Sequence, residues 1–229
     1  MDKKILILLP IWGRESITKI CFDNLKELQK DFNIKVLCIV SEQWAKIEAF
    51  KYGFNQVFAS NECLGTKMNI GVEEALKYDF DYLMNLGSDD IITKDLFKLY
   101  EPYFNNNKAI FGSRKLTFID SQSKEAKEYD YNFLIGAGRC IRKDVLKECV
   151  VKDGVVDMYD KVQAGLDMSS LKRFYKYAHT EIDNDYSTIF DIKSDTNIWS
   201  YNCLKGNNIT FENATKKLNT KQIDKILEL

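Results

Sequence analysis

The chain has 229 residues, of which 45% are hydrophobic, and its 33 basic residues nearly balance its 34 acidic residues. This length and apolar content suffice for one substantial core. The near-zero net charge excludes the basic footprint of a dedicated nucleic-acid-binding protein, so we expect no nucleic-acid partner. A single histidine excludes a site built on several histidines, and the six cysteines form no C-x-x-C pair. We interpret the cysteines as reduced thiols of a cytoplasmic protein.

No transmembrane segment is expected, because no apolar run approaches the roughly 20 residues that span a bilayer. The first apolar run, Ile5 to Leu9, is short, and Pro10 and Trp12 follow it without the small-residue cleavage pattern of a signal peptide. We interpret this run as a buried strand.

Strand and helix patterns alternate over the first hundred residues. Continuous apolar runs, typical of strands that are covered on both faces, predict strands over residues 5–10, 35–40, 56–59 and 80–86. Apolar residues at helical spacing predict helices over residues 16–30, 42–52, 66–77 and 94–104. Ser16 is the expected N-cap of the first helix. This order predicts an α/β fold with a mostly parallel, doubly wound sheet.

The pattern is less regular in the second half of the chain. Residues 109–119 are expected to form one strand, and the polar residues 120–130 a loop or short hairpin that closes over a ligand as a lid. The remaining expected elements are helices over 142–149, 168–177 and 220–229 and a strand over 186–192. No linker, repeat or low-complexity segment interrupts the chain, so we expect a single domain over residues 1–229.

The most informative motif is the acidic pair Asp89-Asp90, which follows the apolar stretch Tyr82 to Leu86. In open α/β sheets the carboxyl ends of the strands form the ligand crevice. Two adjacent carboxylates repel each other there unless a cation is present. A divalent ion such as Mg²⁺ or Mn²⁺ takes oxygen ligands and bridges to phosphate. A turn that caps the helix near Lys94 is an equally acceptable interpretation of the motif.

Two other predicted strands end in candidate ligand-binding residues. After the first strand, Trp12 can stack on a base and Arg14 can contact phosphate, or they can be a core residue and a surface residue. After the second strand, Ser41 and Glu42 can accept hydrogen bonds from a nucleobase or ribose, or they can begin the following helix.

Lys67 and Gly65 open the third predicted helix, where backbone amides and a lysine make an anion site. The glycine spacing there is not that of a P-loop. Within residues 133–141, the Gly136-Ala137-Gly138 segment lacks the dinucleotide-binding spacing, which favours a tight turn or a wall of an acceptor site.

Three polar features of the second half have two interpretations each. Asp167 lies at a helix start, where it is a cap or a general base that faces a cleft. His179 is an ordinary histidine or a late ligand of the same cation. The polar residues Asp191 to Asp195 line a site or form a turn.

Together these motifs resemble the GT-A glycosyltransferases, most closely the inverting, family 2-like nucleotide-sugar glycosyltransferases. The matching segments are residues 7–14, 61–69 and 88–90, with a looser match at residues 136–138 and Asp167. The resemblance implies a Rossmann-like GT-A fold with a mostly parallel central sheet and helices on both faces. It also implies a nucleotide-sugar-binding half over residues 1–105 and a less regular acceptor-binding half over residues 106–229.

The resemblance assigns roles to individual residues. It implies donor binding by Pro10, Trp12, Arg14, Ser41, Glu42, Gly65, Lys67, Asn69 and Ser88. It implies Asp89 as a ligand of Mn²⁺ or Mg²⁺, Asp90 as a ligand or orienting residue, and Asp167 as the base; His179 is the candidate for a further ligand. Gly87 stands where the family usually has its first acidic residue, and Ser41-Glu42 where the second strand usually ends near an Asp.

The implied function is transfer of a sugar from a nucleotide-diphosphate donor, with a UDP-sugar as the first choice. The acceptor is a hydroxyl group of a glycan or another molecule, and the reaction is a metal-assisted direct displacement with inversion. Two alternatives stay open: a sugar-nucleotidyltransferase, disfavoured by the single glycine after the first strand, and a catalytically silent binding module, favoured by Gly87. A NAD-type oxidoreductase lacks its glycine motif.

Overall fold

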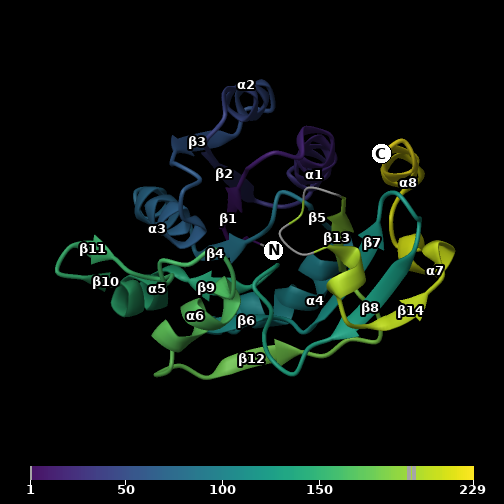
Figure 1. The fold of residues 1–229 in the computed structure, drawn as a ribbon. Coiled ribbons are helices and arrows are strands. Elements are labelled where there is room, and N and C mark those ends of the chain that lie inside the picture. Colours follow the sequence, from purple (N-terminus) through teal and green to yellow (C-terminus); the bar gives the residue numbers. More distant parts are fainter. Residues whose placement is uncertain (1, 195–196, 198–199) are drawn as a thin grey trace.

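The computed structural model describes residues 2–194, 197 and 200–229. Its larger sheet has seven strands, in which only β9 runs antiparallel to its neighbours. In spatial order the strands are β12 (His179–Ile182), β6 (Ile110–Ser113), β9 (Cys140–Arg142), β4 (Tyr82–Asn85), β1 (Ile5–Pro10), β2 (Ile34–Val40) and β3 (Asn55–Phe58). This is the mostly parallel central sheet that the sequence predicts (Figure 1).

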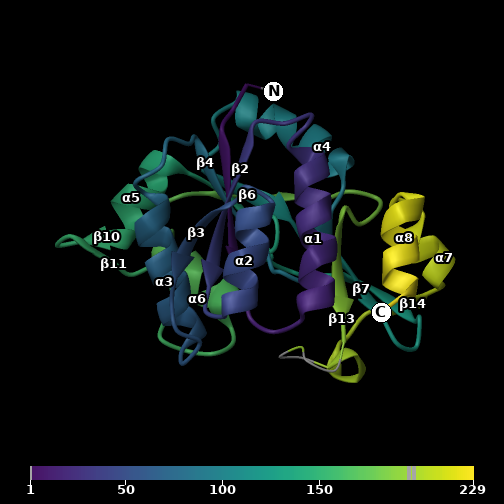
Figure 2. The ribbon, with the colours of Figure 1, turned by 90° about the horizontal axis from the view of Figure 1, so that it is seen from above.

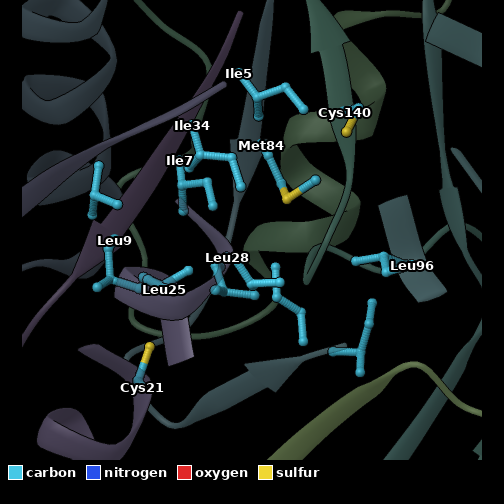
Figure 3. Close-up of a cluster of buried hydrophobic side chains, with 14 of the residues drawn as sticks. Ile5, Ile7, Leu9, Cys21, Leu25, Leu28, Ile34, Met84, Leu96 and Cys140 are labelled. Carbon is cyan, nitrogen blue, oxygen red and sulfur yellow. The ribbon is translucent and has the colours of Figure 1, made fainter. Parts of the chain in front are cut away.

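Helices cover both faces of this sheet, because its central strands are apolar on both faces. Ile5, Ile7 and Leu9 of β1 pack into one hydrophobic cluster (Figure 3). Leu6 and Leu8 pack into a second cluster on the opposite face. The first cluster includes residues of α1 (Glu15–Leu28), α2 (Gln43–Lys51) and α4 (Lys94–Asn105). The second includes residues of α3 (Leu64–Ala75), α5 (Lys143–Val150) and α6 (Leu166–Arg173).

A second sheet of five strands lies beside the first. Its spatial order is β14 (Asn207–Ile209), β8 (Ala126–Asp130), β7 (Lys115–Asp120), β13 (Ile189–Lys193) and β5 (Asp90–Ile92). One face of it packs on α1, α7 (Phe211–Thr215) and α8 (Thr220–Leu227), which Figure 2 shows beside this sheet. The short strand β5 follows β4 closely, so the second sheet begins where the central strand of the first sheet ends.

The antiparallel pairing of β5 with β13 is the feature of this sheet that matters most for the site. It places Asp191 directly opposite Asp90. The main chain also joins the two strands where Ile192 donates a hydrogen bond to the Asp89 carbonyl oxygen, at 2.9 Å. A residue that is distant in sequence therefore lies beside the acidic pair.

The alternating elements up to residue 105 are confirmed, with small shifts at their ends. The N-cap prediction for Ser16 is wrong, because α1 has Arg14 at its N-cap in the left-handed conformation, with φ of 51°. The predicted single strand over 109–119 is also wrong: it is divided between β6 and β7, which belong to different sheets.

The hairpin alternative for residues 120–130 is confirmed, because β8 pairs with β7. The lid prediction is wrong for residues 126–130, since β8 also pairs with β14 and is held on both sides. The sequence did not predict the short strands β5, β9, β12 and β14, the helix α7, the 3-10 helix η1 (Tyr201–Cys203) or the small hairpin of β10 (Val151–Lys152) and β11 (Val155–Val156). Strands from both proposed halves of the chain take part in both sheets.

The membrane and cysteine expectations concern the whole molecule. In the part of the chain that the structure describes, no helix combines the length and the apolar character that crossing a membrane requires. All six cysteines are free thiols. Location in the cytoplasm stays a prediction.

Candidate functional site

The candidate site begins at the turn between β4 and β5. Gly87 lies at this turn, and its backbone N–H donates a 2.6 Å hydrogen bond to Oδ2 of Asp90. A Cβ atom on Gly87 would lie 2.6 Å from Oδ1 of Asp89 and 2.9 Å from Oδ2 of Asp90. Because non-bonded carbon and oxygen atoms do not approach this closely, any side chain at position 87 would have to displace one or both carboxylates. The missing acidic side chain at this position therefore has a packing reason.

Three carboxylates meet at this turn. Asp89, Asp90 and Asp191 each offer an oxygen atom, and these atoms lie within 4.8 Å of one another. Asp89 and Asp90 are 9% and 5% exposed. Such a group of hard oxygen ligands suits Mg²⁺ or Mn²⁺.

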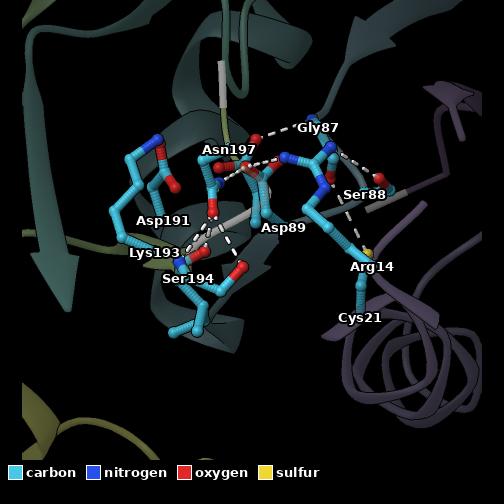
Figure 4. A network of polar contacts seen from close by, with 11 residues as sticks. Arg14, Cys21, Gly87, Ser88, Asp89, Asp191, Lys193, Ser194 and Asn197 are labelled. Carbon is cyan, nitrogen blue, oxygen red and sulfur yellow. Dashed lines mark hydrogen bonds and ion pairs between the residues drawn. The ribbon is translucent and has the colours of Figure 1, made fainter. Parts of the chain in front are cut away.

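Cationic and amide groups of the chain surround the acidic cluster, as Figure 4 shows. Arg14 donates to Asp89 Oδ2 through Nη1 at 2.7 Å and to the Ser88 hydroxyl through Nη2 at 3.2 Å. Asn197 donates from Nδ2 to the same Asp89 oxygen at 2.7 Å. Lys193 forms an ion pair with Asp191 Oδ2, also at 2.7 Å. Part of the negative charge is thus balanced within the protein.

The pKa values of the cluster reflect burial and mutual repulsion. Burial raises the pKa of Asp90 well above its usual range, and the neighbouring Asp191 and Asp89 add to the shift. Burial and the Asp89 charge raise the pKa of Asp191 to about 6. Burial opposes the charged form of Lys193, but Asp191 and Asp89 outweigh it and raise its pKa. Deprotonated carboxylates are costly here, and a bound cation would relieve that cost.

One carboxylate oxygen of the cluster indicates that a cation fits there. Oδ1 of Asp191 is buried and has no hydrogen-bond partner among residues 2–194, 197 and 200–229. A buried carboxylate oxygen without a partner is unfavourable. It points to a missing ligand, and a hard divalent cation held by Asp89, Asp90 and Asp191 matches the donor set.

A cavity of about 210 Å³ lies on one side of the cluster. Its lining comes mostly from the first half of the chain, so we call this the N-terminal side. Pro10, Trp12, Arg14 and Ser88 line it, and Trp12 is 51% exposed. An exposed indole beside an arginine can stack on a base while the guanidinium contacts phosphate. With Lys67, the structure therefore brings five of the proposed donor-binding residues to one cavity.

Lys67 also lines this cavity, but its ammonium group is already occupied. Nζ donates to the Ile11 carbonyl oxygen at 2.5 Å, to Asn61 Oδ1 at 2.6 Å and to the Ser41 hydroxyl at 3.2 Å. These three bonds use its three protons. Burial lowers the pKa of Lys67 to about 8. Its direct role is to hold the ends of β1 and β2 together.

The other proposed donor-binding residues are tied to the chain itself. Glu42 accepts a 2.7 Å hydrogen bond from the Gly13 backbone N–H. Asn69 is bonded through both ends of its amide to the backbone of Met158 and Tyr159. A Cβ atom on Gly65 would lie 1.8 Å from the Asp160 carbonyl oxygen. Gly65 and Asn69 line neither of the two cavities described here, and their contacts fix the segment around residue 160 against α3.

A larger cavity of about 460 Å³ lies on the other side of the acidic cluster, and Asp167 lines it. The Gly136 backbone N–H donates to Oδ2 of Asp167 at 2.8 Å. Arg139, fully buried, donates to the Asp167 carbonyl oxygen at 3.1 Å and to the Ser170 hydroxyl at 2.8 Å. The Gly136 segment is therefore a wall of this cavity, and it positions the Asp167 carboxylate.

The two cavities meet at the acidic cluster. Asp89 and Lys193 line both of them, together with Pro10, Leu64 and Gly87. A donor on one side and an acceptor on the other would thus share the cluster as their boundary.

His179 lies elsewhere in the fold. It begins β12, at the edge of the larger sheet, and its Nε2 is 3.3 Å from the Phe174 carbonyl oxygen. It does not belong to the group of ligand atoms formed by the three carboxylates. The structure does not bring it to the site.

Sequence reasoning gave Asp191 no definite role and did not single out Lys193 or Asn197. One signal was available: Asp191 and Lys193 alternate on an apolar strand and so share one face of it. Asp195, which the sequence grouped with them, lies outside the described residues.

Solved structures share this architecture, whereas no protein-family model and no curated protein sequence matches the chain. The chain is similar to TarS from S. aureus, with a TM-score of 0.58, 12% identity and coverage of 82% of this chain and 36% of TarS. It is also similar to glucosyl-3-phosphoglycerate synthase from Mycobacterium tuberculosis in complex with Mn²⁺, UDP-glucose and phosphoglyceric acid. That match has a TM-score of 0.52 and 14% identity, and it covers 79% of this chain and 70% of the synthase.

The chain has the GT-A glycosyltransferase fold. The same synthase in complex with Mg²⁺ and UDP gives a TM-score of 0.51 at 14% identity, covering 79% of this chain and 69% of that one. The chain spans just over a third of the length of TarS. At these identities the GT-A likeness concerns the fold, and the chemistry has to be argued from the site.

Proposed function

We propose that this chain is a metal-dependent glycosyltransferase that moves a sugar from a nucleotide-diphosphate donor, with a UDP-sugar as the first choice, to an acceptor hydroxyl. The observation that carries the proposal is the meeting of Asp89, Asp90 and Asp191 within 4.8 Å, at the boundary of two cavities. The solved synthase of the same fold, which binds UDP-glucose and Mn²⁺, supports the choice of donor and metal.

The residues of the smaller cavity suit the nucleotide part of the donor. Trp12 offers an exposed ring for the base, and Arg14 offers a guanidinium for the diphosphate. Arg14 would have to exchange part of its contact with Asp89 for phosphate oxygens. A divalent cation held by the three carboxylates would supply charge neutralisation for the leaving diphosphate.

In the larger cavity, Asp167 is the proposed base. The acceptor oxygen attacks the anomeric carbon while the bond from that carbon to the diphosphate oxygen breaks. The hydroxyl proton passes to Asp167, and the bonding electrons leave with the nucleotide diphosphate. Attack from the side opposite the leaving group inverts the anomeric configuration. The Gly136 N–H and Arg139 hold Asp167 in place for this step.

Thermal melting with UDP, GDP, CDP and ADP, each with and without Mn²⁺, tests donor binding. Ligand present at about 100 times its Kd stabilises a folded protein by roughly 2.7 kcal/mol. We expect a rise in melting temperature with UDP that Mn²⁺ increases and that Asp89→Ala abolishes. Asp224→Asn, which changes an exposed acid on α8, is the matched control and should behave as the original protein. Melting curves that none of the four nucleotides shifts would reject the proposal.

A nucleotide-binding module without transferase activity is the second candidate. The observation in its favour is that Arg14 and Lys193 already balance two of the three carboxylates, so the cluster can exist without a metal. This candidate predicts nucleotide binding that Mn²⁺ does not strengthen, and no release of UDP from UDP-sugars. Release of UDP that requires Mn²⁺ would exclude it.

A further inference from the structure

The larger cavity combines an aromatic wall with an acidic floor. Tyr131 and Phe133 line it and are half-buried, and their ring centroids are 5.3 Å apart at an angle of 66°. Leu116, Phe118 and Met168 extend the apolar lining, and Met168 is 46% exposed. Aromatic rings that keep an open side toward a cavity are available to stack on a ligand.

The charged lining of this cavity is strongly one-sided. Among the described residues, four carboxylates line it, those of Asp89, Asp90, Asp167 and Asp191, and Lys193 is the single cation. Lys193 is paired with Asp191 at 2.7 Å, so it offers little attraction to an incoming anion. A donor diphosphate next to the cluster would add negative charge. Arg14 and the proposed divalent cation offset part of this negative charge, but together with Lys193 they carry fewer charges than the four carboxylates and a donor diphosphate. An acceptor that carries a phosphate or carboxylate group would therefore be repelled.

The lining is also unsuited to a purely apolar acceptor. A hydrocarbon chain against the carboxylates would displace water from them and offer no donor to Asp191 Oδ1, which already lacks a hydrogen-bond partner within the described residues, and this is unfavourable. Ionised carboxylates only accept hydrogen bonds, so they suit a ligand that is rich in hydroxyl donors. A sugar ring has such hydroxyls around its rim and C–H groups on its faces. The C–H faces suit the rings of Tyr131 and Phe133.

We propose that the acceptor is an uncharged carbohydrate, which stacks on Tyr131 and Phe133 and presents one hydroxyl to Asp167. This inference rests on the proposed function and adds the chemical class of its second substrate. The cavity of about 460 Å³ is of the size that binds small organic ligands. The phosphoglyceric acid bound by the synthase of the same fold belongs to the class that this cavity excludes.

An assay of UDP release separates the two proposals. UDP release from UDP-sugars with Mn²⁺ and water alone reports on the donor reaction and needs no acceptor. Neutral probes (maltose, cellobiose, lactose and chitobiose) are then compared with charged probes (glucuronic acid, glucose 6-phosphate and 3-phosphoglycerate) and with decanol. We expect the neutral sugars alone to stimulate UDP release, with formation of a glycosylated product detected by mass spectrometry.

Substitutions in the aromatic wall locate the acceptor. Phe133→Leu and Tyr131→Leu remove a flat ring but keep an apolar side chain, and each should raise KM for the sugar acceptor about 3- to 10-fold. Tyr175→Leu is the control, since Tyr175 is 78% exposed and lines neither cavity. Phe133→Leu also serves where Tyr131→Leu fails to fold, because Tyr131 packs against the core.

The outcomes distinguish a failure of the neutral-acceptor inference from a failure of the proposed glycosyltransferase function. UDP release that only charged probes or decanol stimulate, or that none of the four sugars stimulates, overturns the neutral-acceptor inference and leaves the donor chemistry intact. An unchanged KM in both wall variants overturns the stacking. Absence of UDP release in water and with every probe overturns the proposed function itself.

Discussion

The two sides of the acidic cluster are built in different ways. On the N-terminal side, Asp89 and Asp90 are neighbours in sequence at the end of β4, whose parallel partner β1 belongs to the alternating part of the chain. On the C-terminal side, Asp191 arrives through an antiparallel pairing between β13 and β5, two strands far apart in sequence. The first side follows from a local pattern, whereas the second depends on which strands pair.

Local sequence patterns are sufficient to place the residues of the first side only. Parallel strands joined by helices follow chain order in the sheet, so their ends, and the residues after them, can be placed together from the sequence. The position of a strand in a second sheet does not follow from the order of strands along the chain. If both sides contribute equally to the site, substitutions on the C-terminal side should lower turnover or metal binding as much as substitutions on the N-terminal side.

The largest effect is expected from Asp167, on the C-terminal side. Asp167→Asn should lower turnover roughly 1,000-fold, because a general base of this kind contributes about 10²- to 10⁴-fold. The affinity for UDP and Mn²⁺ should stay the same, because Asp167 lines the larger cavity and does not line the smaller one. Steady-state kinetics together with nucleotide titration check this. Weakened UDP binding with normal turnover would show that Asp167 is not the base.

The next largest effect is expected on Mn²⁺ affinity, where one variant from each side of the cluster can be compared. Asp89→Asn and Asp191→Asn should each weaken Mn²⁺ binding roughly 100-fold. Residues that only hydrogen-bond to metal ligands contribute roughly 10- to 100-fold to metal affinity, so a direct ligand should contribute at least as much. Asparagine keeps the shape of the side chain and removes its charge. Isothermal titration of Mn²⁺ in the presence of UDP measures the effect. A loss in Asp89→Asn alone would mean that Asp191 lies beside the metal site without being part of it.

The fold was largely predictable, because the apolar runs of β1, β2 and β4 and the helices between them are local signals. The chain forms two sheets because residues 109–119 break between Ser113 and Lys115, and β7 leaves the larger sheet there. Nothing in the apolar pattern marks this break. The polar residues Ser113 and Arg114 lie at the break, but polar side chains also occur within single strands.

The site was predictable in part for the same reason. Trp12, Arg14 and Ser88 follow strand ends and come together as expected. The partners of Asp191 and the aromatic wall depend on contacts between segments distant in sequence, which no local pattern encodes. Lys67 had the position expected of a phosphate ligand, but its occupation by Ile11, Ser41 and Asn61 becomes visible only when these segments meet.

A smaller effect is expected at Gly136, which supports Asp167. A Cβ atom there would lie 1.9 Å from Oδ1 of Asp167, so Gly136→Ala has to displace the carboxylate. Turnover should fall roughly tenfold or more, toward the roughly 100-fold that a 1 Å misplacement can cost. In the double variant Gly136→Ala with Asp167→Asn, the alanine should add nothing further. Additive losses would mean that Gly136 acts on something other than Asp167.

The smallest effect concerns Lys67, which joins the ends of β1 and β2 on the N-terminal side. The unfolded chain keeps the Lys67 proton up to the ordinary pKa of 10.5, whereas burial lowers the pKa in the folded protein to about 8. Between these values the unfolded state binds more protons, so the free energy of unfolding rises with pH. This residue should contribute about 1 kcal/mol of that rise between about pH 8 and pH 9. Urea unfolding of the original protein and of Lys67→Met, with exposed Lys46→Met as the control, measures it. Parallel pH profiles for the original protein and Lys67→Met would show that Lys67 keeps its proton in the folded state, and that its three hydrogen bonds outweigh the cost of burying its charge.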